Sequence, residues 1–374
     1  MPVGKQGRIV ELDGLRGAAA LSVVLAHYFG EVPHRIGALA VGWIGVDVFF
    51  VLSGFLVGGI LLDNREAPNL LATFYLRRAA RIFPVYYVVL LLSIGFSDAA
   101  RSHGWADFHY PWFVFAAYAQ NVAMAFSGRL PGNSFLPMWT LAVEEQFYLL
   151  MPLVIRYCPP RYLKWVVAFG IVSAPVLRLI FEAAGNPDAS LVLLPCRWDG
   201  LLLGVAVAIV QRDHDLRDAL VRHTGAVRGV ALIAIAVVPI SLALAPQLLT
   251  TLTLFDLLIV ITLFMLLVLN DAPEGARLRW RPLQFFGRVS YCLYLAHQPI
   301  ANAMHGLILG GRPDIGSPGQ VGVTIAAFGV SIGVAMVTWR FIEAPCIAFG
   351  KRWQYQRVGV ALVDDSSTAH AAVT

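Results

Sequence analysis

The chain has 374 residues, of which 58% are hydrophobic and only 14% are charged, whereas an ordinary soluble domain is about 45–50% apolar and about 25% charged. This composition excludes a water-soluble globular protein. Glycine and proline are frequent, with 33 and 21 residues, but they follow no repeating period, which excludes collagen-like and coiled-coil proteins. In a membrane protein the positions of basic residues mean more than the net charge of +5, so we expect contact with the lipid bilayer and none with nucleic acid.

Apolar runs of about the length of a bilayer-spanning helix, roughly 20 residues, recur along nearly the whole chain. Because the loops between them are short, we expect one all-α polytopic integral membrane helical bundle over 1–350. A cytoplasmic tail over 351–374 is expected to be disordered at its end. The ten predicted transmembrane helices cover 15–31, 41–62, 82–97, 136–155, 163–181, 199–211, 228–245, 248–269, 289–309 and 321–343.

A further apolar stretch, 112–126, is shorter than a usual span and is typical of a re-entrant or interfacial segment. Lys and Arg are enriched in cytoplasmic loops. If 112–126 does not cross the membrane, all but six of the 28 basic residues lie on the cytoplasmic side. If it crosses, the basic clusters at 212–228 and 277–288 face outward. The charge pattern therefore favours ten spans with both termini in the cytoplasm.

Ionisable side chains inside the apolar spans are candidate functional residues, because a charge in the bilayer is costly. Arg16 and His27 are separated by eleven residues, which places them on one face of an α-helix, about 16 Å apart along its axis. Alternatively, Arg16 extends to the interface and His27 only bonds to a neighbouring helix. Asp47 and Ser53 lie among small and aromatic residues of the second span. Asp47 is there either a partner for a charged group across the bundle or a hydrogen-bonded packing residue.

A basic cluster in the segment FYLRRAARIFP, made up of Arg77, Arg78 and Arg81, precedes the third span. It is either an ordinary cytoplasmic anchor or a clamp for a phosphorylated ligand, because guanidinium groups bind phosphate in a bidentate manner. Glu144 and Glu145 lie inside the fourth span and point about 100° apart on a helix. A carboxylate beside an imidazole would hold the histidine in the tautomer that a general base needs. The alternative is that both carboxylates only form interhelical hydrogen bonds.

Polar residues of the later spans also have two interpretations. Arg197 and Asp199 form either an interfacial ion pair or part of a binding site, and His297 is either a hydrogen-bonded core residue or a site residue. The four cysteines are scattered, with no histidine at metal-ligand spacing, so we expect no metal site. Motifs of serine hydrolases, NTPases and zinc peptidases do not occur in the sequence.

Seven segments resemble, in this order, the acyltransferase-3 family of bacterial membrane O-acyltransferases: LDGLRGAAALSVVLAHY, GVDVFFVLSGF, RRAARIFP, WTLAVEEQFYLLMP, RWDGLLLGV, VSYCLYLAHQP and FIEAP. They extend over 10–347. The resemblance implies a ten-helix domain of the bacterial inner membrane. Such a domain takes an acyl group, usually acetyl, from cytoplasmic acyl-CoA and places it on a hydroxyl of a cell-envelope glycan, lipid-linked sugar or secondary metabolite.

The resemblance also implies roles for single residues. Arg16 and His27 match the essential Arg and His of the family, and Glu144 matches the glutamate of its VExxFY element. His27 is then the expected general base, oriented by Glu144, with direct transfer and an acyl-histidine intermediate both open. The residues expected to hold the phosphates and pantetheine of acetyl-CoA are Arg77, Arg78, Arg81 and Arg16. The residues expected to bind the acceptor are Asp47, Ser53, Arg197, Asp199 and His297.

Other interpretations stay open at this point. Some family members carry an additional SGNH-type periplasmic domain, so we expect this chain to act alone or with a separate periplasmic partner, and a homo-oligomer is also compatible with the sequence. A transporter or flippase for a glycan or small metabolite would likewise place polar residues near the centre of a helical bundle. A non-catalytic subunit of a polysaccharide export complex is a third reading.

Overall fold

The computed structural model describes residues 9–102, 109–129, 133–223 and 273–356, together with positions 225, 226, 229 and 256. All regular structure in these ranges is helical, which confirms the predicted fold class. Helices satisfy every backbone N–H and C=O inside the segment itself, as an apolar environment requires.

The helices follow the predicted apolar runs. The first seven are α1 (Val10–Leu25), α2 (Gly45–Asp63), α3 (Leu70–Ser102), α4 (Trp112–Ala116), α5 (Gln120–Ser127), α6 (Met138–Tyr157) and α7 (Pro160–Ala183). The others are α8 (Pro187–Val192), α9 (Leu194–Arg212), α10 (His214–Arg222), α13 (Pro273–Leu278), α14 (Arg281–Leu309), α15 (Pro318–Thr338) and α16 (Ala344–Gly350). Four tighter or wider helical turns adjoin them: the π-helical turns η1 (Ala26–Gly30) and η4 (Trp339–Glu343), and the 3-10 turns η2 (Gly37–Ile44) and η3 (Asn133–Phe135).

Within the described ranges, five helical stretches are long and apolar enough to cross a membrane, which indicates a polytopic integral membrane protein. They are Gly37–Asp63, Leu70–Phe96, Pro160–Ala183, Pro187–Arg212 and Pro318–Gly350. Three described predictions, 15–31, 136–155 and 289–309, are not among these five. The predicted spans 228–245 and 248–269 lie outside the described residues except for positions 229 and 256. The count of ten spans therefore stays a prediction.

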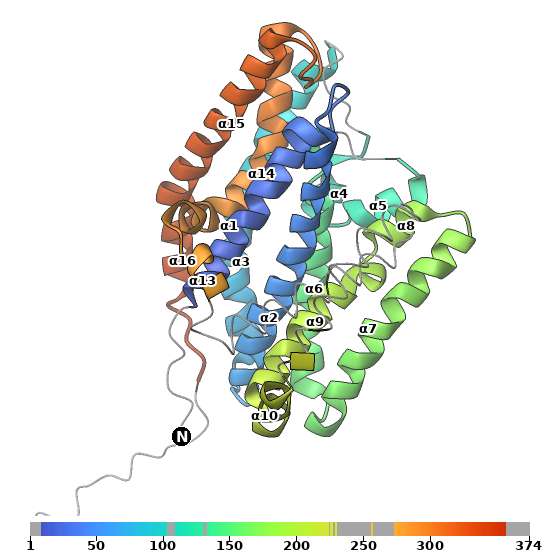
Figure 1. Cartoon of the computed structure of the whole chain (residues 1–374), viewed down its shortest axis with the longest axis vertical. Helices are drawn as coiled ribbons and strands as arrows, with labels where there is room; N and C mark the ends of the chain where they lie inside the picture. Colours follow the sequence, from blue (N-terminus) through green and yellow to red (C-terminus); the bar gives the residue numbers. More distant parts are fainter. Residues whose placement is uncertain are drawn as a thin grey trace, which may run out of the picture.

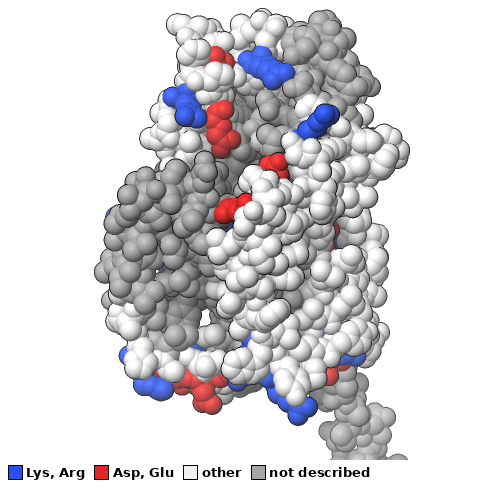
Figure 2. Space-filling model, turned by 90° about the vertical axis from the view of Figure 1, so that its right-hand side faces the viewer, with Lys and Arg blue, Asp and Glu red and all other residues white. Residues whose placement is uncertain are grey.

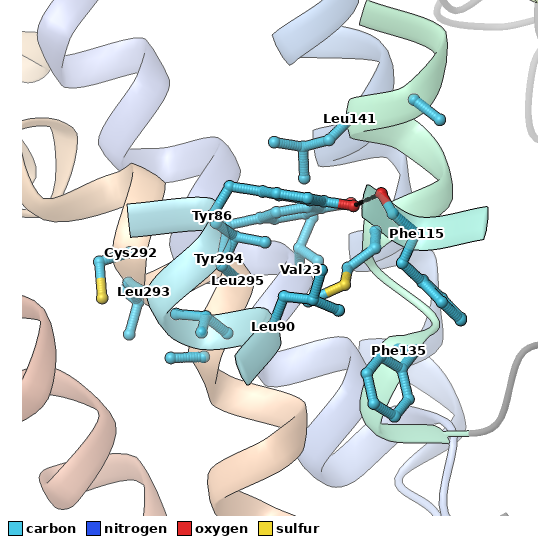
Figure 3. Packing of buried hydrophobic residues seen from close by; sticks show 14 of the residues in the cluster. Val23, Tyr86, Leu90, Phe115, Phe135, Leu141, Cys292, Leu293, Tyr294 and Leu295 are labelled. Carbon is cyan, nitrogen blue, oxygen red and sulfur yellow. Dashed lines mark hydrogen bonds between the residues drawn. The ribbon is translucent and has the colours of Figure 1, made fainter. Parts of the chain in front are cut away.

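The short apolar segment 112–126 forms two helices, α4 and α5, that meet at Tyr118. Tyr118 has φ 52°, a left-handed conformation that is uncommon for a bulky side chain. Tyr86 of α3 donates to the carbonyl of Phe115 over 2.8 Å (Figure 3), and Tyr87 donates to the next carbonyl over 2.9 Å. These bonds attach the end of α4 to α3, in addition to the backbone bond of 3.0 Å that the Tyr118 N–H donates to the Phe115 carbonyl.

The long helices form two packed groups (Figure 1). In one, α14 lies between α1 and α15, and in the other, α9 lies between α2 and α7. The contact between α1 and α2 joins the groups. On the face shown in Figure 2, Lys, Arg, Asp and Glu lie toward the lower and the upper end, and most of the described surface between the two ends is uncharged.

Pairs of glycines let the packed helices approach closely. A Cβ at Gly54 of α2 would lie 1.8 Å from the carbonyl oxygen of Leu201, and a Cβ at Gly204 of α9 would lie 2.1 Å from that of Val51. Such contacts are typical of membrane helix pairs, whose association depends on close van der Waals packing.

Two buried ion pairs connect the second group of helices. Arg197 of α9 binds Asp47 of α2, and Arg178 of α7 binds Asp199 of α9 through two hydrogen bonds of 2.8 and 3.2 Å. All four side chains are at most 3% exposed. The predicted partner for a charged group across the bundle is confirmed for Asp47. The interpretation of Arg197 and Asp199 as partners in one ion pair is wrong, because residues two apart on an α-helix point in different directions.

We predict that Gly54→Ala lowers the stability of the protein by about 1–3 kcal/mol, since the added methyl group must displace the backbone of α9. Thermal unfolding of the purified protein in detergent measures the loss. Gly333→Ala in α15 is the matched control, because a Cβ there has nothing within 4 Å. Equal melting temperatures for the two variants would contradict the close approach of α2 and α9.

We also predict that Asp47→Ala lowers stability by about 3–5 kcal/mol, because it leaves the buried Arg197 guanidinium without its carboxylate. The double variant Asp47→Ala/Arg197→Met should recover most of this loss in the same unfolding assay. Asp63→Ala breaks a pair with Arg212 in which Asp63 is 52% exposed, and should cost less than about 1 kcal/mol. A double variant as unstable as Asp47→Ala would show that the pair is not the cause.

Candidate active site

His27 lies in η1, the π-helical turn after α1, and contacts His297 in the middle of α14. Nδ1 of His27 is 2.6 Å from Nε2 of His297, and the two rings are parallel within 3°. The apolar run 15–31 predicts one continuous α-helix, but the α-helix ends at Leu25. The arithmetic of 100° per residue therefore does not extend to His27. π-Helical turns within helices frequently occur at functional sites.

Residues next to the histidine pair fix it from two sides. Tyr28 donates to the backbone carbonyl of His297 over 2.7 Å, and its oxygen is 2.9 Å from the hydroxyl of Ser331 in α15. On the other side of His27, Nε2 is 3.6 Å from Oε2 of Glu31. Neither Tyr28 nor Glu31 is among the residues predicted for the site. The spacing of four residues between His27 and Glu31 was a readable signal, because residues i and i+4 of a helix are neighbours.

Glu144 of α6 faces α2 and not the histidine pair. Its Oε1 accepts a hydrogen bond of 2.9 Å from Ser53, and its Oε2 accepts one of 3.0 Å from Tyr148. The expected orientation of His27 by Glu144 is wrong, since the ring partner of His27 is His297. The physical reason is that α6 packs against α2, which carries Ser53.

A cavity of about 70 Å³ lies between α1, α2, α3, α6 and α14. Its polar lining includes Arg16, Ser53, Arg78, Arg81, Glu144 and Tyr148. The remaining wall is largely apolar and aromatic, with Phe49, Phe50 and Leu141 among its residues. Three guanidinium groups and one carboxylate in the described lining give the cavity an excess of positive charge. This arrangement suits an anionic ligand with an apolar portion.

Arg77 has a different environment from its neighbours in the basic cluster. Its Nε donates to the carbonyl of Trp353 over 2.6 Å, and its guanidinium lies 4.7 Å from the ring centre of Tyr355. Arg77 is not among the described residues that line the cavity. Residues 351–356 of the predicted tail are thus attached to α3, and Asn69, which directly precedes α3, donates to the carbonyl of Gln354 over 2.9 Å.

Tyr294 connects the cavity to the histidine pair. Its ring lines the cavity and its centre is 6.0 Å from that of His297. Its hydroxyl is 2.8 Å from that of Thr140 in α6. Figure 3 shows the buried cluster to which Tyr294 belongs, with Val23 of α1 and Leu141 of α6 nearby. The cavity and the histidine pair are therefore neighbouring parts of one region.

Apart from Arg77, the predicted site residues fall into three places. The cavity brings together Arg16, Arg78, Arg81, Ser53 and Glu144, and the second place is the contact of His27 with His297. The third comprises Asp47, Arg197 and Asp199, which are engaged in ion pairs together with Arg178. Asp256, also missed, lies buried beside Gly200 of α9. The described residues contain no group of three or more His, Cys, Asp or Glu that could hold a metal ion.

Comparison with known proteins gives two kinds of match. The family model described as an acyltransferase domain, Acyl_transf_3, matches residues 9–340. The peptidoglycan O-acetyltransferase OatA of Listeria monocytogenes is 28% identical over 361 residues, which cover 90% of this chain and 55% of that protein. The putative peptidoglycan O-acetyltransferase YrhL of Bacillus subtilis is 26% identical over 386 residues, which cover 96% of this chain and 58% of that protein.

The chain spans little more than half the length of these curated relatives. No solved structure matches it. The family match includes α1, α14 and every described residue that lines the cavity. Because it extends over most of the 374 residues, the chain belongs to the acyltransferase domain family.

Proposed function

We propose that this protein is a membrane O-acyltransferase that moves an acetyl group from acetyl-CoA to a hydroxyl of a cell-envelope glycan. The observation that carries the proposal is the positively charged cavity next to a buried histidine pair, in a chain of an acyltransferase family. The names of the two relatives support a peptidoglycan-like acceptor. We place the protein in the bacterial inner membrane with both termini in the cytoplasm.

Arg16, Arg78 and Arg81 are the residues proposed to bind the donor. Coenzyme A carries phosphate groups, which guanidinium groups bind through paired charge-assisted hydrogen bonds. The apolar and aromatic wall of the cavity suits the pantetheine arm. Arg77 is already bonded to Trp353, so we assign it a supporting role at the cavity entrance.

The chemistry needs a base and correct alignment of the substrates, because a thioester is already activated. His27 takes the proton of the acceptor hydroxyl, whose oxygen attacks the thioester carbonyl carbon. The carbon–sulfur bond then breaks, and the departing thiolate takes the proton from the imidazolium to give free coenzyme A. Transfer through an acyl-histidine requires the same base position and the same donor site.

We assign Ser53 to the donor cavity, where it bonds to Glu144. Asp47, Arg197 and Asp199 are buried and paired, so we propose that they hold α2, α7 and α9 in place around the cavity. They would then influence acceptor binding through the positions of these helices.

His27→Ala should lower acetyl transfer by about 10²–10⁴-fold, the usual contribution of a general base, and leave donor binding intact. The measurement is the appearance of label from radiolabelled acetyl-CoA in extracted envelope material, using membranes with matched amounts of protein. His305→Gln is the control, because His305 is a buried residue of the same helix as His297 but bonds to Thr324 instead.

Label at the wild-type level with His27→Ala would remove His27 from the mechanism. If neither the wild type nor the variant transfers label, and the wild type also fails to bind coenzyme A, the transporter reading replaces the acyltransferase.

Arg81→Gln should raise the KM for acetyl-CoA by about 10- to 100-fold, because a hydrogen bond to a charged group contributes about 1.5–3 kcal/mol. The kcat at saturating donor should change much less. Arg352→Gln is the control, since Arg352 lies over the ring of Phe349 and is exposed. Arg77→Gln should have a smaller effect than Arg81→Gln. An unchanged KM for Arg81→Gln would rule out the cavity as the donor site.

A further inference from the structure

We propose that His297 is a positioning residue that fixes the tautomer of His27. The structure contains a chain of hydrogen bonds from the carbonyl of Leu293 through His297 to His27. In this chain each imidazole donates from Nδ1, so the Nε2 lone pair of His27 stays free to accept a proton. The inference rests on the proposed role of His27 as the general base, and adds the group that prepares His27 for that role.

The first link determines where His297 carries its proton. Nδ1 of His297 is 3.2 Å from the carbonyl oxygen of Leu293. A carbonyl oxygen can only accept a hydrogen bond. The proton of a neutral His297 therefore lies on Nδ1, and its Nε2 carries a lone pair.

The second hydrogen bond determines where His27 carries its proton. Nε2 of His297 is 2.6 Å from Nδ1 of His27. Because Nε2 of His297 is the acceptor of this hydrogen bond, Nδ1 of His27 must be the donor. A neutral imidazole has one N–H donor and one acceptor nitrogen. With its proton on Nδ1, His27 has its free lone pair on Nε2. The tautomer of a histidine is commonly set in this way by the partner of its other ring nitrogen.

The orientation of the His297 ring is fixed by its surroundings, so its Nε2 stays directed at His27. His297 is 0% exposed, and its backbone carbonyl accepts the hydrogen bond from Tyr28. The ring of Tyr294 lies 6.0 Å from its ring on one side, and the ring of His27 lies parallel to it on another. A rotation of the His297 ring would break its bonds to both Leu293 and His27.

The surroundings also favour the state that follows proton transfer. Once Nε2 of His27 is protonated, its N–H lies 3.6 Å from the carboxylate of Glu31, whose negative charge stabilises the imidazolium. The other titratable groups in contact with the pair are the phenols of Tyr28 and Tyr294. The pair therefore has an acceptor nitrogen before the proton moves and a countercharge afterwards.

The direct test is the tautomer itself, read by ¹⁵N and ¹³C NMR of ring-labelled histidines in the purified wild-type protein. Comparison with the spectrum of His27→Ala assigns the His27 signals. We expect neutral His27 to carry its proton on Nδ1. A wild-type His27 with its proton on Nε2 would overturn the proposal, whatever the activity of the variants.

Two substitutions then test the consequence for catalysis. His297→Leu removes the acceptor, and should lower kcat by about 10²–10⁴-fold, as loss of the correct tautomer does in a catalytic triad, with the KM for acetyl-CoA unchanged. The His27 proton should then no longer be confined to Nδ1. His297→Gln places an amide oxygen near the position of Nε2 and should restore part of the kcat and the Nδ1 tautomer. His305→Gln should change neither the tautomer nor the kcat.

The outcomes separate this proposal from the function on which it rests. If His27→Ala abolishes transfer but His297→Leu leaves both kcat and the tautomer unchanged, His27 is the base and His297 does not position it. If His27→Ala retains transfer, the proposed role of His27 as the base fails, and the role of His297 in catalysis fails with it. A melting temperature of His297→Gln equal to that of the wild type would show that its kcat reports on the hydrogen bond and not on folding.

Discussion

A polar group buried in an apolar helical bundle needs a partner, and in this protein the partner usually comes from another helix. The carboxylate of Asp47 binds Arg197, Arg178 binds Asp199, and Glu144 binds Ser53. Each bond therefore fixes the relative position of two helices. In the described part of the chain, Arg16 and Arg81 are different, since both line the cavity and neither forms a hydrogen bond to a carboxylate. Their guanidinium groups are the reason why we propose an anionic donor for this cavity.

The sequence is enough to predict helices and the positions where polar groups interrupt them, because both depend on local composition. For Asp47 it leaves two interpretations open, and the structure supports the one with a charged partner across the bundle. The sequence does not reveal which partner, since that depends on which helices pack together. Glu144 was expected beside His27 because a carboxylate can orient an imidazole. In the structure α6 packs against α2, and Glu144 accepts a hydrogen bond from Ser53. Long-range pairing of this kind requires the tertiary structure.

Helix geometry could nevertheless have predicted some of the missed side-chain contacts. Arg197 and Asp199 are two residues apart and cannot face each other, whereas His27 and Glu31 are four apart and can. The short segment 112–126 was rightly separated from the long spans. Its break at Tyr118 could not be foreseen, because a left-handed tyrosine is rare. That conformation depends on tyrosines of α3 that bond to the end of α4.

The geometry of the histidine pair depends on the packing of α1 against α14. A Cβ at Gly17 of α1 would lie 2.0 Å from the carbonyl oxygen of Leu283, and a Cβ at Gly287 of α14 would lie 1.9 Å from that of Asp13. The two helices run parallel, and each histidine follows the glycine of its own helix by ten residues. The glycine contact thus fixes the relative height of α1 and α14, and with it the distance between His27 and His297. A hydrogen bond of 2.6 Å tolerates little displacement, so the close approach at the glycines is a structural requirement of the proposed base.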